Sequence, residues 1–360
     1  MLLRLLRWTG GLLFGLLVLG AIPIVYVETQ CTAPPNGWQA AAPYRSVLPS
    51  DTGKRPEART WLTYPEWYIV YSAESYGRYL AAGKPPSGFS YLRQIGGFWS
   101  GLCAVNRAAG SAEAGDAKVM LYTIGLSFTA EMAIKGAYEN VFGRISEWIG
   151  GWKSANDRYS AEIWQRYGAF MHETPWYQFG FLDALKGLWR TESASAPYRN
   201  WERRLALSTE FGIKSAYGGA IGFASNNALG PAQLSVPLVL GGTPQAIAAA
   251  DPRLKLNGLL PGGLAAVEAP RYAQLTDALV KLSATPVELF EIAGNDDVLL
   301  TVIAPDAAAV PQGSHGLFAE PLDDRPGWRR LGLAVKVPRL LATIREARAA
   351  GIEIEHVYDY

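Results

Sequence analysis

The chain has 360 residues, of which 49% are hydrophobic and 18% charged, and its formal net charge is +1. This length allows two ordinary domains, the composition argues against disorder, and the small net charge excludes a bulk positive field that would recruit nucleic acid. The 12 Trp and 18 Tyr side chains suit interfaces that are apolar on one side and wet on the other.

Residues 1–30 are predicted to form an uncleaved transmembrane signal anchor. Residues 9–27 carry no charge over 19 positions, close to the roughly 20 residues that a helix needs to cross a bilayer. The alternative is a cleaved signal peptide, whose apolar region usually spans about 7–15 residues and ends in small residues. Arg4 and Arg7 precede the span, and no Lys or Arg follows it before Arg45. The positive-inside rule therefore predicts a single-pass bacterial inner-membrane protein whose body faces the periplasm.

Residues 31–60 are rich in Pro and turn-forming residues and are expected to form an extended linker. Cys31 begins this linker, and the second cysteine of the chain is Cys103. Both are compatible with an oxidising compartment. A disulfide between them would stabilise the fold by about 4 kcal/mol on the chain-entropy argument. The alternative is two unrelated buried thiols.

Residues 61–230 are predicted to form a mainly α-helical domain. A capping box of Thr63 and Glu66 is expected to begin the first helix. The longest apolar stripe at helical spacing runs over residues 118–149. A weaker alternative is that the apolar residues 119–134 enter the bilayer, which would make the chain a multi-span membrane protein. Helical patterns are also present at 63–83, 95–110, 157–173, 176–190 and 199–224.

Residues 231–360 alternate between strand and helix signals and are predicted to form a small α/β sandwich. Residues 287–293 and 298–304 flank "GNDD" and are expected to pair as a β-hairpin. Residues 305–330 are expected to be a disordered insertion that separates the two halves of the sandwich. The fold class is therefore α+β, with an N-terminal transmembrane helix, a helical domain and a C-terminal sandwich for which a ferredoxin-like arrangement is the candidate.

Familiar catalytic signatures are missing from the sequence. It contains no phosphate-binding glycine loop, no G-x-S-x-G, no H-E-x-x-H and no C-x-x-C. The three histidines, His172, His315 and His356, are far apart in different predicted elements. No metal site and no cofactor are predicted, and His356 is expected to belong to the core.

One polar pattern stands out, because "EMAIKGAY" at 131–138 nearly recurs as "EFGIKSAY" at 210–217. Each copy places a Glu and a Lys four residues apart on an apolar helical stripe. In the simplest interpretation they form an i, i+4 pair on a solvated face, worth about 0.2–0.5 kcal/mol. In the alternative, the two helices face each other and each buried Glu needs the opposite Lys or a Tyr hydroxyl. The candidate polar cluster comprises Glu131, Lys135, Tyr138, Glu210, Lys214 and Tyr217.

A second candidate site is aromatic. Its side chains would line a pocket for an apolar ligand or lipid, or else belong to the core or to a bilayer interface. The residues are Tyr64, Trp67, Tyr68, Tyr71, Trp176 and Tyr177.

The runs "TYPEWYIVYSAESYGRYL" and "YTIGLSFTAEMAIKGAYE" resemble an uncharacterised group of bacterial membrane-anchored proteins with no known activity. This resemblance implies a location and assigns no functional residue. The sequence therefore predicts an extracytoplasmic binding or assembly protein, more a binding protein than an enzyme, with the membrane, a lipid or another membrane protein as its partner. The alternative is an enzyme or lipid-handling protein that uses a pocket between the helices carrying Glu131 and Glu210.

Overall fold

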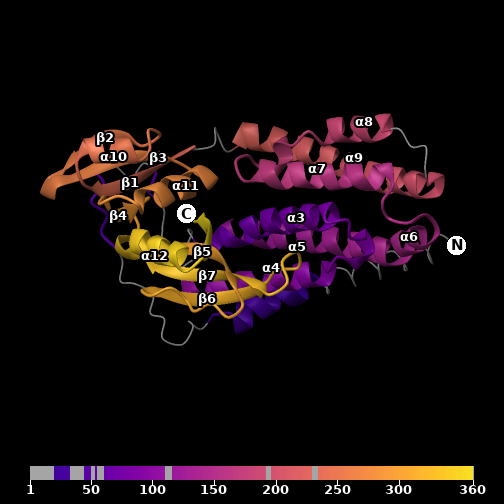
Figure 1. Ribbon diagram of the computed structural model, residues 1–360, viewed down its shortest axis with the longest axis horizontal. Coiled ribbons are helices and arrows are strands. Elements are labelled where there is room, and N and C mark those ends of the chain that lie inside the picture. The colour runs from indigo at the N-terminus through magenta and orange to yellow at the C-terminus, as the bar shows by residue number, and fades with distance from the viewer. Residues whose placement is uncertain are drawn as a thin grey trace.

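The structure is a computed structural model that describes residues 20–32, 44–49, 53–54, 61–109, 116–191, 196–228 and 234–359. Its long helices lie before residue 228, and its two four-stranded antiparallel sheets follow residue 235. Figure 1 shows the helices, here called the helical region, beside the sheets, here called the strand region. The α+β class expected from the sequence is therefore confirmed.

The helical region follows the apolar periodicity of the sequence closely. The first helix begins without the expected capping box: Thr63 itself has helical torsions (φ −76°, ψ −15°) and makes no side-chain cap, so its backbone carbonyl receives the Glu66 N–H instead. The long helices are α3 (Tyr64–Ala81), α4 (Tyr91–Ala109), α5 (Asp116–Tyr138), α6 (Arg144–Gly150), α7 (Ala155–Met171), α8 (Phe181–Arg190) and α9 (Pro197–Ala228). Short 3₁₀ turns, η1 (Pro86–Gly88) and η3 (Trp176–Gln178), separate α3 from α4 and α7 from α8.

The predicted 118–149 helix contains a π-helical turn, η2 (Glu139–Gly143), between α5 and α6. A π turn adds a residue per turn and rotates the helix faces that follow it, and such turns are frequent at functional sites. The helix ends at Gly151, whose positive φ of 73° is a conformation that glycine adopts readily. Apolar periodicity alone does not indicate this turn.

The first sheet contains a β-α-β-β-α-β succession. Its elements are β1 (Ser235–Gly241), α10 (Pro244–Ala250), β2 (Lys255–Leu260), the turn η4 (Pro261–Gly263), β3 (Leu264–Pro270), α11 (Ala273–Leu282) and β4 (Glu288–Ile292). The strand order is β2-β3-β1-β4, and all neighbours are antiparallel.

The second sheet repeats this order as β6-β7-β5-β8, again with antiparallel neighbours. Its elements are β5 (Asp297–Pro305), β6 (Ser314–Pro321), β7 (Trp328–Lys336), α12 (Val337–Ala349) and β8 (Glu353–Val357). A loop joins β5 to β6 where the first sheet has α10. Two sequence predictions are wrong here. β4 and β5 belong to different sheets and form no hairpin, and the supposed insertion 305–330 contains β6.

The two sheets share one hydrophobic core, to which α11 and α12 contribute. The outer face of the second sheet packs on the helical region, since Leu299, Ala334 and Tyr358 belong to the core of that region. Tyr64 of α3 stacks on Phe318 of β6, with ring centres 4.4 Å apart. The single sandwich predicted from the sequence is thus a pair of sheets, one of which is covered by the helical region.

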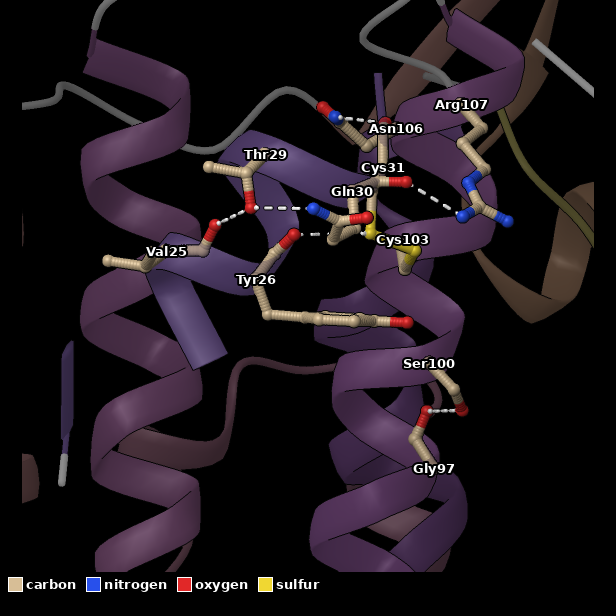
Figure 2. The surroundings of a disulfide bond; sticks show 10 residues. All are labelled: Val25, Tyr26, Thr29, Gln30, Cys31, Gly97, Ser100, Cys103, Asn106 and Arg107. Carbon is tan, nitrogen blue, oxygen red and sulfur yellow. Dashed lines mark hydrogen bonds between the residues drawn. A yellow bond between two sulfur atoms is a disulfide. The ribbon is translucent and has the colours of Figure 1, made fainter. Parts of the chain in front are cut away.

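Residues 20–30 form a helix that leads into Cys31, and Cys31 is joined to Cys103 of α4 by a disulfide. Figure 2 shows the surrounding hydrogen bonds, in which Asn106 donates to the Cys31 carbonyl at 2.9 Å and Arg107 to the Gln30 carbonyl at 2.7 Å. The bridge fastens the end of the N-terminal helix to the helical region.

The predicted transmembrane segment 9–27 falls mostly outside the described residues, as does most of the predicted linker 31–60. Over the part of the chain that is described, no helix combines the length and apolar character needed to cross a membrane. This finding includes α5, which contains the candidate second span 119–134.

Candidate functional site

The two similar motifs lie on facing helices and pair with each other. Lys135 of α5 contacts Glu210 of α9 at 2.7 Å, and Lys214 of α9 contacts Glu131 of α5 at 2.8 Å. The predicted i, i+4 pairing within each helix is therefore wrong, and the alternative, pairing with the opposite helix, is confirmed. The physical reason is that both motifs point inward, where each ion needs a partner.

Aromatic rings surround the two ammonium groups. Lys135 Nζ lies 3.8 Å from the ring centre of Trp164 and 4.1 Å from that of Tyr76, while Lys214 Nζ lies 5.5 Å from that of Tyr167. Such cation–π contacts gain strength when they are desolvated. Burial lowers the pKa of Lys135 against the opposing effect of Glu210. Burial raises the pKa of Glu131, but the nearby Lys214 lowers it by more, so the pKa of this carboxyl lies below its ordinary value.

A third ion pair continues the series toward α6. Arg203 of α9 donates two hydrogen bonds to Glu139, at 2.8 and 3.1 Å, so the pairs 131–214, 135–210 and 139–203 succeed one another along antiparallel helices. We call these six residues the α5–α9 charge ladder. Glu139 is the first residue of the π turn, and its burial raises its pKa against the effect of Arg203.

Arg199, one turn before Arg203 on α9, forms further buried ion pairs next to the ladder. Its side chain is fully buried, and it donates to Asp157 at 2.8 Å and to Glu202 at 2.9 Å. Sequence reasoning missed Arg199 and Arg203 because arginines on a helix are ordinarily exposed. Their only sequence signal is the density of charge in "RNWERR".

The remaining two members of the predicted polar cluster lie apart from the ladder's two Glu–Lys pairs. The Tyr138 hydroxyl donates to Glu202 at 2.7 Å, beside the arginines. Tyr217 is half exposed and stacks on Trp176, with ring centres 5.4 Å apart. The structure thus brings four of the six predicted residues together and leaves Tyr138 and Tyr217 at the margins.

Every charge of the ladder has a partner of opposite sign within hydrogen-bonding distance. This arrangement fixes the register of α5 against α9, and no nucleophile or free base is evident within it. The described residues also contain no group of three or more His, Cys, Asp or Glu side chains arranged to hold a metal ion.

The predicted aromatic pocket is divided in two. All four tyrosine and tryptophan side chains of α3 in this set are buried: Tyr64, Trp67 and Tyr71 in the contact with the second sheet, and Tyr68 against Phe98 of α4 and Phe128 of α5. Trp67 stacks on His356 of β8, with ring centres 3.7 Å apart. The other two predicted residues, Trp176 and Tyr177, are partly exposed in η3, next to Gly218 of α9. The first group therefore joins the two regions instead of forming an open apolar pocket.

A cavity of about 250 Å³ does open in this contact, between α3, α4, β6 and β7. We call it the α3–β6 cavity. Its walls include the rings of Tyr68 and Tyr71 and the charged side chains of Arg93, Glu320, Asp323 and Arg330. It is therefore more polar than the pocket that the sequence predicted.

Two carboxylates compete for one guanidinium beside this cavity. Arg330 donates to both oxygens of Glu355, at 2.6 and 2.7 Å, whereas Glu320 lies 3.7 Å from Arg330. Tyr64 donates to Glu320 Oε2 at 2.7 Å, but Glu320 Oε1 is buried and has no hydrogen-bond partner among the described residues. Burial raises the pKa of Glu320 to about 7 against the effect of Arg330.

The end of the helical region opposite the sheets exposes large apolar side chains. Trp148 of α6 is 87% exposed and Trp201 of α9 is 62% exposed. Trp189 of α8 lies beside Trp201, with ring centres 6.0 Å apart. The contact between Gly150 and Arg199 shows that α6 packs against the start of α9. Figure 1 shows α6 at this end. We call this end of the helical region the aromatic end; the large apolar side chains exposed there are Trp148, Ile149, Trp152, Trp189, Tyr198 and Trp201.

The aromatic end has a basic margin. Arg144, Lys153 and Arg190 are exposed there, whereas the nearby carboxylates of Glu147 and Asp157 are buried. Comparison with known proteins gives no guide to this surface: no protein-family model, curated protein or solved structure matches the chain. The resemblance to a bacterial membrane-anchored group thus stays a prediction.

Proposed function

We propose that the protein is a membrane-anchored, extracytoplasmic binding or assembly protein whose aromatic end rests on an anionic lipid surface. The observation that carries the proposal is the number of exposed Trp and Tyr side chains at that end, with Trp148 at 87% exposure. Exposed apolar patches of this kind mark interaction sites. Trp and Tyr concentrate where a bilayer meets water.

The exposed basic side chains at this end favour an anionic lipid surface as the partner. Arg144, Lys153 and Arg190 are exposed around the rings, and each basic residue near an anionic leaflet contributes about 1 kcal/mol. Two acidic side chains of the described part of this end, Glu147 and Asp157, are turned inward, toward Arg199. Repulsion between carboxylates and lipid headgroups is thereby reduced.

The direction of the N-terminal helix agrees with this orientation. Glu28 contacts Lys118 near the start of α5, whereas Gly20 lies beside Leu126 farther along α5. Moving back along the chain from Glu28 to Gly20 therefore leads toward α6 and the aromatic end. The Cys31–Cys103 disulfide supports an oxidising compartment, such as the periplasm.

The alternative, catalysis or lipid handling between the helices that carry Glu131 and Glu210, is less well supported. Both carboxylates are neutralised by lysines at 2.7–2.8 Å. Lys214 holds the pKa of Glu131 below its ordinary value, which makes that carboxylate a poor general base.

Quenching of tryptophan fluorescence by brominated phospholipid tests the proposal. The full chain is reconstituted into vesicles of anionic lipid, and Trp148→Phe and Trp201→Phe are compared with Trp328→Phe, a matched change in β7 of the strand region. The fraction of emission quenched by the lipid should fall for the first two variants and not for the third. Equal quenching in all three would overturn the lipid assignment.

We also infer that the strand region consists of two ferredoxin-like units. The β-α-β-β-α-β succession and the order β2-β3-β1-β4 of the first sheet support this inference. The second unit has the same order and lacks only the first helix. An experimental structure with a different strand order would contradict it.

A further inference from the structure

We propose that a second copy of this chain docks on the outer side of α5 and α9, which makes the protein a two-fold dimer. We call this surface the α5–α9 face. It comprises the exposed residues from Val119 to Phe142 on α5 and η2 and those from Leu205 to Phe223 on α9, and none of these exposed residues is charged. By contrast α7, a helix of the same region, exposes Arg158, Glu162 and Arg166, as a surface helix ordinarily does.

The α5–α9 charge ladder places the exposed sides of the two helices on the same side of the molecule. Its three ion pairs show that α5 and α9 face each other and run antiparallel. On α5 the ladder residue Glu131 follows an exposed residue and precedes a buried one, and Glu210 of α9 does the same. Because two antiparallel helices that face each other are related by a two-fold axis through the seam, this shared order puts both exposed sides above the same seam.

The α5–α9 face has the area that a stable dimer needs. Five of its large apolar side chains are exposed on α5 and η2, including Ile134 at 72%, and four on α9, including Phe223 at 76%. An aromatic side chain carries roughly 150–250 Å² of surface, and an aliphatic one about half as much. At the exposures observed, these side chains offer on the order of 700 Å². A typical monomer exposes a largest apolar patch of roughly 300–600 Å², and each partner of a stable complex buries about 800 Å².

The uncharged character of the face favours a second copy as its occupant. A two-fold contact uses the same patch on both partners, so a charged face would oppose like charges, whereas this face opposes none. The bilayer interior is a poorer partner, because Glu131 at the edge of the face keeps 34% of its side chain exposed and a charge in hydrocarbon is costly. The rim of a protein interface, in contrast, stays in contact with water. A two-fold axis parallel to α5 would also leave the aromatic ends of both copies at one membrane, as the proposed function requires.

Light scattering after size exclusion tests the dimer on the full chain in detergent, with the detergent mass subtracted. The wild type should show twice the chain mass of 39.1 kDa. Ile134→Glu and Ile213→Glu should each raise the dissociation constant of the dimer at least about tenfold, because each change buries two carboxylates in the contact. Leu259→Glu, at a site in β2 that is 71% exposed, is the matched control and should leave the mass unchanged. A monomer at every concentration, with its face covered by detergent or lipid, would overturn the proposal, as would a dimer that neither change on the face weakens.

Chemical cross-linking locates the contact without placing a charge in it. Ile134→Cys and Ile213→Cys are treated with a short bis-maleimide, with which the bridged Cys31 and Cys103 do not react. At least one of the two variants should give a covalent dimer on a denaturing gel, and Leu259→Cys should stay monomeric. A covalent dimer from Leu259→Cys alone would place the contact on the strand region and overturn the assignment. The lipid-quenching test of the aromatic end does not depend on this contact, so the two proposals can fail separately.

Discussion

The ammonium of Lys135 lies 2.7 Å from a carboxylate oxygen of Glu210, although the two residues come from helices separated by α6, α7 and α8 in the chain. The pair is largely buried, with side-chain exposures of 10% and 18%. Removing one partner leaves the other ion without compensation, which is the costly way to disrupt a buried pair. Lys135→Met should therefore lower the free energy of unfolding by up to about 3 kcal/mol.

A double-mutant cycle in urea measures this coupling. The double variant Lys135→Met/Glu210→Met should recover most of the loss, because it removes both charges together. Lys186→Met, which disrupts an exposed pair with Asp183, should change stability by less than about 0.5 kcal/mol. Additive effects of the two single changes would show that the contact does not stabilise the fold.

The apolar periodicity of the sequence was enough to predict the long helices, but it could not determine the partners of the charges on them. Glu131 and Lys135 are four apart on α5, a spacing that suits a pair within one helix equally well. Which interpretation holds depends on whether the stripe faces another helix, and that is a tertiary property. The π turn at Glu139 and the burial of Arg199 also depend on contacts between helices, which the local sequence pattern does not specify.

The strand region was harder to predict, for a topological reason. The strand character of β4 and β5 is local and was recognised, but their separation into two sheets depends on pairing with distant strands, such as β1 with β4. The strand β6 was missed because its sequence "SHGLFAEP" has little β-branched character. The cavity at Glu320 lies beside that missed strand, so the sequence alone did not place it.

The disulfide provides the second prediction. Cys31 and Cys103 are 72 residues apart, and closing a loop of this length contributes about 4 kcal/mol on the chain-entropy argument. The double variant Cys31→Ser/Cys103→Ser should unfold at lower urea concentration than the wild type. A thiol assay on denatured protein should find no free thiol before reduction and two after it. Two thiols in the untreated protein would contradict the bridge.

Close packing between α3 and α4 gives a third prediction. A Cβ at Gly97 would lie 2.0 Å from the hydroxyl oxygen of Tyr68, whereas a Cβ at Gly96 would meet nothing within 4 Å. Gly97→Ala should therefore destabilise the fold by about 1–3 kcal/mol through overpacking. Gly96→Ala is the matched control, and it should be neutral or stabilising by up to about 1 kcal/mol, because Ala favours helix over Gly. Thermal unfolding of the two variants distinguishes them, and similar melting temperatures would rule out the close contact.

The last prediction concerns His356, which is buried against Trp67 and whose Nδ1 lies 3.3 Å from the Thr276 hydroxyl. Burial, with a smaller contribution from His172, holds the pKa of His356 well below its ordinary value. In the unfolded chain His takes up a proton near pH 6.5, whereas the folded chain does not. Stability from this residue is therefore fully present above about pH 6.5 and is lost as the pH falls toward the folded-state pKa.

The size of this effect follows from the proton uptake of the unfolded chain alone. At about pH 5 the loss should reach about 2 kcal/mol, at about 1.4 kcal/mol per pH unit. Glu66 and Glu320 act in the opposite direction, since burial raises the pKa of each to about 7 and their contribution falls as the pH rises from about 4.5 to 7. The difference in unfolding free energy between wild type and His356→Gln cancels these carboxyl terms. That difference should shrink between about pH 7 and pH 5, and a difference independent of pH would mean that His356 takes up a proton as readily in the folded chain as in the unfolded chain.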